Sequence, residues 1–146
     1  MKHVFMLLLL LVTMGYADGL VLPYNKASIE VYDGDTFYVD LDISDCPDVL
    51  CKRVPIRISG IDTPELKHSN AVVKKYAILA RNLLEDFLTV NEVFLHNCKR
   101  DMYYRLDCEV MSVSGVDYNT YIIGKQLAVP YYGKTKTYDW SKHTIK

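Results

Sequence analysis

The sequence predicts an α+β domain built on a small five-stranded β-barrel with helices packed against it. Three observations favour this class: five short segments resemble β-strands, one amphipathic helix separates the third from the fourth, and half of the 146 residues are hydrophobic, which is enough for a buried core. The formal net charge of -1 at pH 7 excludes the whole-surface positive field that drives non-specific binding to nucleic acids. Any polyanionic partner must therefore be held locally.

The first 17 residues have the layout of a secretory signal peptide. A charged start precedes an apolar run over residues 4–12, and Gly15-Tyr16-Ala17 provides a small-x-small cleavage site. The apolar run is too short to span a bilayer comfortably, although a buried N-terminal helix or an uncleaved anchor is the alternative. We expect residues 18–146 to form a single domain, secreted or periplasmic, that has no membrane contact once the signal is removed.

The first three strands follow from composition and alternation. Residues 27–32 and 36–41 are rich in Ile, Val, Tyr and Phe, and Asp33-Gly34-Asp35 between them is typical of a tight hairpin turn. Residues 54–61 alternate apolar with polar side chains, which predicts a third strand with Arg57 on its polar face.

The predicted amphipathic helix covers residues 70–88. Its apolar residues recur at intervals of three and four, as on one face of a helix. They are Val73, Tyr76, Ala77, Ala80, Leu83, Leu84 and Phe87. Residues 92–98 and 105–113 then predict a second hairpin, and residues 118–127 a short helical segment before an irregular tail.

All four cysteines follow the predicted signal peptide. In an oxidising compartment an even number of cysteines indicates disulfides. Cys98 and Cys108 are equally distant from Tyr103, so a hairpin that turns there brings them opposite each other. Cys46 then remains for Cys51. A zinc site is the alternative, but neither pair has the Cys-x-x-Cys spacing of zinc ligands.

Four acidic residues lie at the ends of predicted strands: Asp33, Asp35, Asp62 and Glu65. If both turns lie at one end of the barrel, these carboxylates converge, and each pair about 4 Å apart repels by roughly 4 kcal/mol at an effective dielectric constant near 20. A cation would relieve this repulsion. Because the candidate ligands are all oxygen atoms, calcium or magnesium is favoured over zinc or copper, and calcium tolerates ligands from two separate turns better than magnesium does.

Two arginines complete the set of candidate functional residues. Arg57 lies on the third strand and Arg105 follows the turn of the second hairpin. A guanidinium group binds phosphate oxygens in pairs and neutralises the charge that develops on phosphorus during hydrolysis. Surface salt bridges to neighbouring acids are the structural alternative for each arginine taken singly. Two arginines, a hard cation and a spare carboxylate together are what metal-assisted phosphodiester hydrolysis needs.

These residues fall into four motifs, in order along the chain. They are Asp33-Gly34-Asp35-Thr36, Arg57-Ile58-Ser59-Gly60-Ile61-Asp62-Thr63-Pro64-Glu65, Asp101-Met102-Tyr103-Tyr104-Arg105, and Leu127-Ala128 with tyrosines after it. From about residue 27 to residue 132 the chain resembles the staphylococcal nuclease (thermonuclease) family, as a secreted homologue of the bacterial type. The resemblance implies an OB-fold barrel and a calcium-dependent nuclease of little sequence specificity that cleaves DNA and RNA and leaves 3'-phosphate ends.

The resemblance also implies a role for each site residue. Asp35 and Asp62 would bind calcium directly together with the Thr63 carbonyl, and Asp33 would act nearby through water. Glu65 would be the general base or would orient the attacking water.

Both arginines have an implied role as well. Arg57 and Arg105 would bind the scissile phosphate, and Arg105 would also assist the departure of the 5'-oxygen.

The domain is expected to be a monomer.

Two positions depart from the family pattern at glycines. Tyr104 stands where the family usually has glycine before the arginine, so its backbone must avoid the left-handed region or bear strain. Gln126 stands where a glycine is common before Leu-Ala. The long C-terminal helix of the best-known member is missing, because the chain ends soon after Trp140.

Aromatic and basic side chains offer a further binding surface. Tyr103, Tyr131 and Tyr132 would flank the site and stack on bases, and four lysines could contact more distant phosphates. These are Lys67, Lys74, Lys134 and Lys136. Ordinary packing and solvation of these side chains is the structural alternative.

Two other functions are possible for such a domain. One is an OB-fold module that binds nucleic acid and has lost catalysis, and the other is a calcium-stabilised extracellular interaction domain. Neither needs the acids and both arginines together, which favours the nuclease.

Overall fold

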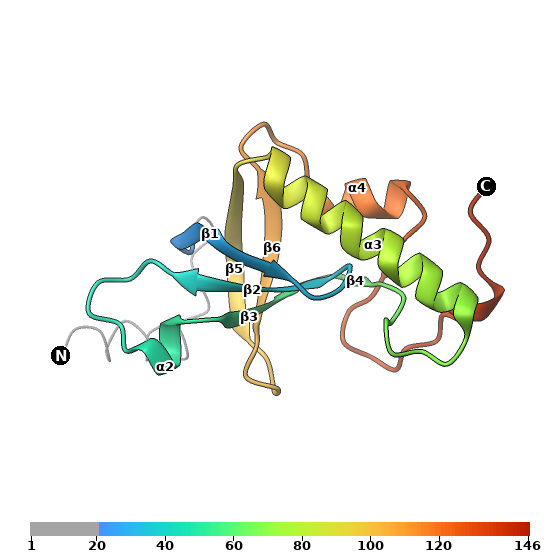
Figure 1. Ribbon diagram of the computed structural model, residues 1–146, viewed down its shortest axis with the longest axis horizontal. Coiled ribbons are helices and arrows are strands. Elements are labelled where there is room, and N and C mark those ends of the chain that lie inside the picture. Colours follow the sequence, from blue (N-terminus) through green and yellow to red (C-terminus); the bar gives the residue numbers. More distant parts are fainter. Residues whose placement is uncertain (1–20) are drawn as a thin grey trace.

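The computed structural model describes residues 21–146, and the predicted signal peptide, residues 1–17, lies outside this part. Five strands form one mixed sheet in the order β1-β2-β3-β6-β5. Their bounds are β1 Tyr24–Val31, β2 Thr36–Leu41, β3 Val54–Ile58, β5 Val93–Arg100 and β6 Leu106–Ser112. Figure 1 shows β1, β2 and β3 running across the β5–β6 hairpin, so the sheet is strongly bent.

The five strands are the predicted ones, and the fold is an α+β, OB-fold-like domain. Neighbouring strands pair antiparallel except β3 and β6, which are parallel. The barrel is an open one, because the edge strands β1 and β5 do not pair with each other along their length. Within residues 21–146, the segment before β1 contacts β5 through a bridge between Val21 and His96 and through the hydrogen bond from the Leu22 N–H to the Leu95 carbonyl, 2.7 Å long.

The amphipathic helix is α3, Ala71–Val90, and it lies along one side of the sheet with the shorter α4, Tyr118–Gly124, beside it (Figure 1). Asn70 caps α3, since its side chain accepts hydrogen bonds from the next N–H groups. The buried residues of α3 lie mostly on the predicted face: Val73, Ala77, Ala80, Leu84, Phe87 and Leu88. They close the core over the bent sheet.

The predicted third strand, residues 54–61, is in fact two strands. Gly60 has a φ of +82°, which turns the chain out of β3. The following strand β4, Ile61–Asp62, pairs with β7, Val129–Pro130, in a separate two-stranded sheet. This break directs the residues after β4 away from the main sheet.

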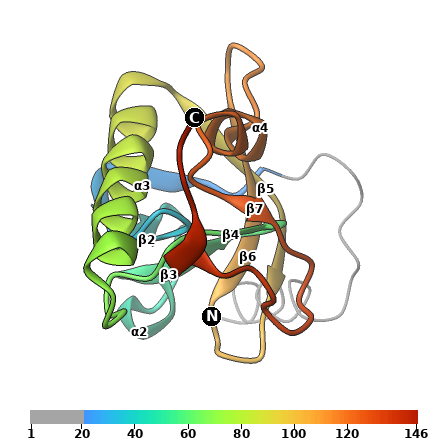
Figure 2. The same ribbon diagram turned by 90° about the vertical axis from the view of Figure 1, so that its right-hand side faces the viewer.

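Two short helices were not predicted. Helix α2, Asp48–Cys51, lies in the loop between β2 and β3, and the 3-10 helix η1, Trp140–Lys142, lies near the C-terminus. The C-terminal segment, red in Figure 2, passes over β4, and η1 packs against α3. The tail is therefore part of the fold.

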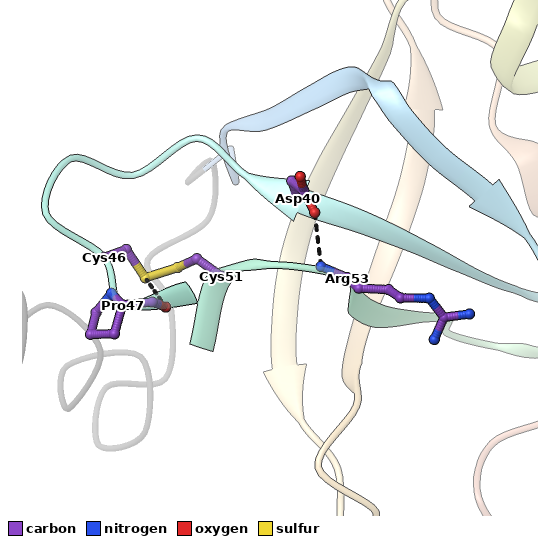
Figure 3. Close-up of a disulfide and its surroundings, with 5 residues drawn as sticks. All are labelled: Asp40, Cys46, Pro47, Cys51 and Arg53. Carbon is purple, nitrogen blue, oxygen red and sulfur yellow. Dashed lines mark hydrogen bonds between the residues drawn. A yellow bond between two sulfur atoms is a disulfide. The ribbon is translucent and has the colours of Figure 1, made fainter. Parts of the chain in front are cut away.

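Both predicted cysteine pairs are joined in the structure. Cys98 and Cys108 connect β5 to β6 with their Cα atoms 4.1 Å apart, and Cys46 and Cys51 are joined over 6.1 Å. Figure 3 shows that the Cys46–Cys51 disulfide closes the loop that contains α2. Two residues after Cys51, the backbone N–H of Arg53 donates to Asp40. Among residues 21–146, none of the helices combines the length with the apolar composition that a membrane span needs.

Candidate active site

The turn between β1 and β2 is the first part of the candidate site. The Asp35 N–H donates to Asp33 Oδ1 over 3.1 Å, and the Tyr118 hydroxyl donates to the Gly34 carbonyl over 2.8 Å. A Cβ atom on Gly34 would lie 2.6 Å from the Ala80 Cβ. The backbone of Gly34 is not left-handed. This glycine is therefore required by close packing against α3, rather than by the turn itself.

Asp35 joins this turn to the loop after β4. Its buried Oδ2 accepts hydrogen bonds from the Thr63 N–H, 3.2 Å away, and from the Thr63 hydroxyl, 2.9 Å away. Its Oδ1 accepts from the Thr36 hydroxyl over 3.0 Å. Two turns that are 28 residues apart are thus held at one end of the sheet.

Arg57 extends from β3 beneath these turns. Its terminal nitrogens donate to the carbonyl of Ile58 and, over 2.6 Å, to the carbonyl of Ile61. Nη2 also lies 3.4 Å from Asp35 Oδ2. The guanidinium group therefore braces the β3–β4 turn and balances a buried carboxylate. Only 12% of its side chain is exposed, so it offers one edge to a ligand.

A cleft of about 190 Å³ brings the predicted catalytic residues together. Its walls include Asp33, Asp35, Arg57, Thr63, Glu65 and Arg105. They come from two turns, from β3 and from the residue that precedes β6. The structure therefore assembles in one place groups that lie up to 72 positions apart in the sequence.

Arg105 is positioned by the turn between β5 and β6. Its Nε donates to Asp101 Oδ2 over 2.8 Å, and its guanidinium carbon lies 5.3 Å from the centre of the Tyr103 ring. Hydrogen bonds from this arginine and from the backbone lower the pKa of Asp101, although burial opposes them. In residues 21–146 the terminal Nη groups of Arg105 donate to no other residue, so they can serve a bound anion.

Both positions at which glycine is replaced have a left-handed backbone. Tyr104 has a φ of +62° and Gln126 a φ of +59°. Tyr104 therefore bears the strain and does not avoid the left-handed region, and Arg105 lines the cleft with the other predicted catalytic residues. Gln126 ends the α4 segment three residues earlier than predicted, and its carbonyl pairs with His143 Nε2 over 2.6 Å.

Asp62 and Glu65 share a cation supplied by the C-terminal tail. The Lys136 ammonium lies 2.7 Å from Asp62 Oδ1 and 3.1 Å from Glu65 Oε1. Burial opposes the charge on Lys136, but the two carboxylates outweigh it and raise the pKa of the lysine. The other oxygen of Asp62 accepts a hydrogen bond from the Trp140 indole over 3.2 Å. The four acids therefore stand as two pairs, Asp33 with Asp35 and Asp62 with Glu65.

The donor chemistry of the site fits a hard cation. Burial, together with the neighbouring charge of Asp35, raises the pKa of Asp33 to about 7, and a bound cation would offset both effects. Asp62 Oδ1 is buried and accepts no hydrogen bond of acceptable angle from residues 21–146. Within the same residues no three His, Cys, Asp or Glu side chains form a ready-made metal cluster. Asp35 and Asp62 are the carboxylates, and Thr63 the carbonyl, that could hold a metal.

The predicted tyrosines occupy different surroundings. Tyr131 and Tyr132 line a second cleft of about 580 Å³, which also includes Asp62, Lys134 and Lys136. Lys136 lines both clefts. Tyr103 is 69% exposed and lies against Arg105, outside these two clefts. Tyr131 and Tyr132 therefore line a different cleft from the predicted catalytic residues, and both clefts include Lys136.

Sequence reasoning missed the contribution of Trp140. It lies 78 residues from Asp62, and no local pattern connects the two. The pairing of Lys136 with two acids was missed for the same reason. The one available signal was that the chain has a single tryptophan, Trp140. This signal does not indicate which residue Trp140 contacts.

The chain matches a family of known proteins. The family model described as staphylococcal nuclease homologue matches residues 55–144, a range that includes Arg57, Glu65, Arg105 and the C-terminal segment. No curated protein matches the chain.

Proposed function

The chain belongs to the family of staphylococcal nuclease homologues, and on this premise we propose that it is a calcium-dependent nuclease. It hydrolyses phosphodiester bonds of DNA and RNA with little sequence specificity and leaves 3'-phosphate ends. The observation that carries this proposal is the cleft in which Glu65, Arg57 and Arg105 meet the Asp35 turn.

Glu65 is the residue best placed to act on water. Its side chain is 64% exposed, so solvent reaches the carboxylate directly, and its neighbour Lys136 keeps it close to the cleft. A carboxylate in this setting accepts a proton from water or orients it toward phosphorus. We assign Glu65 the role of general base.

The two arginines have different roles in binding the scissile phosphate. Arg105 is 33% exposed and its terminal nitrogens have no partner in residues 21–146, so it can bind two phosphate oxygens at once. Arg57 is mostly buried and braced by carbonyls, which fixes the direction of its remaining N–H groups. Both charges stabilise the dianionic pentacoordinate phosphorus, and Arg105 also stabilises the departing 5'-oxygen.

Calcium would be held by Asp35, Asp62 and the Thr63 carbonyl, with Asp33 acting through water. Oxygen ligands from two turns suit calcium, and magnesium is the less favoured alternative. When bound, the metal supplies a positive charge that polarises the phosphate.

Substrate binding extends from the cleft to the flanking aromatic residues. Tyr103, Tyr131 and Tyr132 offer ring faces for stacking with bases, which is tolerant of sequence. Lys67 lines the first cleft and Lys134 the second, where both can contact neighbouring phosphates. The weak overall charge suits an enzyme that must release its products.

The proposed site of action is outside the cytoplasm, in a periplasm or in the medium. The signal-like residues 1–17 and the two disulfides favour an oxidising compartment. We propose that the mature domain acts as a monomer.

The decisive experiment is digestion of single-stranded DNA and RNA by the purified residues 18–146 in calcium, in magnesium and in chelator. We expect cleavage in calcium and loss of it in chelator, and phosphatase treatment should remove a phosphate from the new 3' ends. Binding of DNA without cleavage in every buffer would instead identify a binding module without catalysis.

Glu65→Gln tests the assigned base. Turnover should fall by about 10²–10⁴-fold, while the affinity for single-stranded DNA changes little. Glu85→Gln on α3 is the matched control, because it removes the same charge from an exposed position outside the site and should leave turnover unchanged. Equal turnover of Glu65→Gln and the parent protein would remove Glu65 from the mechanism.

A further inference from the structure

Lys136 places a positive charge where the metal site is proposed. Its ammonium lies 2.7 Å from Asp62 Oδ1 and 3.1 Å from Glu65 Oε1. Only 6% of the Asp62 side chain is exposed, so water does little to compensate this carboxylate. The lysine is therefore the counter-ion of a nearly buried acid.

The two oxygens of Asp62 have different partners. Oδ2 accepts the indole N–H of Trp140 over 3.2 Å. Oδ1 is paired with the ammonium of Lys136, 2.7 Å away, and no group of residues 21–146 donates to it in a well-aligned hydrogen bond. Oδ1 is thus the oxygen that a metal would take, and it is the one beside which the lysine stands.

The tail is fastened on both sides of Lys136. Before it, the Tyr131 N–H donates to the Gly60 carbonyl over 2.9 Å, and the Tyr131 hydroxyl donates to the Lys134 carbonyl over 2.5 Å. After it, Trp140 is buried, and its ring lies 4.9 Å from that of His143. The Lys146 N–H donates to the Gln126 side chain over 3.0 Å. These contacts hold the backbone on both sides of Lys136 in place, so displacement of its ammonium from Asp62 requires rotation of the lysine side chain alone.

We propose that Lys136 is a built-in cation that occupies Asp62 Oδ1 and is displaced when a divalent cation binds. The proposal rests on the calcium dependence proposed above. Lys136 and the metal compete for the same oxygen, and their like charges repel at short range. Lys136 therefore weakens calcium binding and stabilises the two acids when the cation is absent, so that the site forms before the metal arrives.

The test is calcium titration of Lys136→Met by calorimetry, with thermal unfolding measured in chelator and in excess calcium. Methionine keeps an unbranched apolar chain and removes the charge. The dissociation constant for calcium should fall by about tenfold or more. In chelator the variant should melt below the parent protein, and calcium should raise its melting temperature by more than it raises that of the parent.

Two further variants separate this effect from a change of overall charge or of fold. Lys134→Met removes the same charge two residues earlier from an exposed lysine that has no ion pair in residues 21–146, and it should leave calcium affinity within about twofold of the parent. Lys136→Arg keeps a positive charge at the same place, so its calcium affinity should stay as weak as that of the parent protein. Fluorescence of Trp140 reports whether the tail is still docked.

Each result decides the question. Equal calcium affinities of Lys136→Met and the parent overturn the competition, and they leave the nuclease proposal intact if calcium still supports cleavage. If Lys136→Met and Lys134→Met change the dissociation constant for calcium equally, only the overall charge affects calcium binding, and the competition at Asp62 is overturned. If neither the parent nor the variant binds calcium, the calcium dependence itself is overturned, and the competition falls with it.

Discussion

The Trp140 indole donates a hydrogen bond to Asp62 Oδ2, 3.2 Å away, and so links the C-terminal tail to the acid that ends β4. The indole is fixed in turn by Tyr138 and His143, whose rings lie 4.7 Å and 4.9 Å from it. A buried carboxylate that accepts a fixed donor keeps one orientation. The tail therefore determines which oxygen of Asp62 is available to a ligand.

Trp140→Phe should remove this hydrogen bond and keep most of the aromatic packing. Because a buried charged acceptor loses its donor, we expect the free energy of unfolding to fall by about 1.5–3 kcal/mol. Chemical denaturation followed by circular dichroism measures the change. Tyr138→Phe, which loses only the hydroxyl that faces His143, is the control and should cost much less. Equal losses in the two variants would mean that the contact with Asp62 contributes nothing.

Gly34→Ala should destabilise the domain by about 1–3 kcal/mol, because the new Cβ would overlap Ala80 and Thr63. The turn that carries Asp33 and Asp35 would be displaced as well, so turnover should fall. Gly124→Ala provides the comparison, since nothing lies within 4 Å of a Cβ there, and it should be neutral or slightly stabilising. A melting temperature of Gly34→Ala equal to that of the parent would refute the packing argument.

Tyr104→Gly should stabilise the protein. A left-handed backbone costs a residue other than glycine about 1–2 kcal/mol, and the extra chain entropy of glycine returns about 0.5–1 kcal/mol of this. The expected gain is about 0.5–1 kcal/mol, measured by denaturant unfolding. Met102→Gly in the same exposed turn has no such strain to release and should show no gain. If Tyr104→Gly also fails to gain stability, the turn stores no strain at Tyr104.

The contributions of Asp107 and Asp101 to the stability of the fold should change with pH in opposite directions. Burial raises the pKa of Asp107, and the arginine charges nearby do not compensate it. Its contribution to stability is therefore present below the unfolded pKa of about 3.8 and is lost as the pH rises through the folded pKa. Asp107→Asn should raise the melting temperature at pH 7 and have little effect near pH 3.

The folded pKa of Asp101 is lowered, so its contribution is present at neutral pH and is lost as the pH falls below about 3.8. Asp101→Asn should lower the melting temperature at pH 7, with a smaller effect near pH 3. Melting curves of the two variants and the parent from pH 3 to pH 8 test both signs together. Parallel curves for Asp101→Asn and Asp107→Asn would contradict the opposite shifts.

Local patterns predicted most of the fold. Strand β2 begins and ends at the predicted residues, and helix α3 differs from its prediction by one or two residues at each end. These elements depend on alternation and on spacing within a few residues. The break of the third strand at Gly60 was not predicted, because a glycine in a β-pattern is equally compatible with a continuous strand. Strand β7 and helix η1 depend on partners that are remote in sequence.

The sequence by itself determined which chemical groups the protein has for a site, namely acids at two turns, two arginines in motifs of the nuclease family, and two cysteine pairs that flank turns. Tertiary structure alone decided their relations: Asp35 bound to Thr63, Lys136 between Asp62 and Glu65, and Trp140 on the far oxygen of Asp62. The physical reason is distance. Residue type and spacing encode chemistry and local geometry, whereas a contact across 70 residues exists only once the bent sheet, α3 and the tail have packed together.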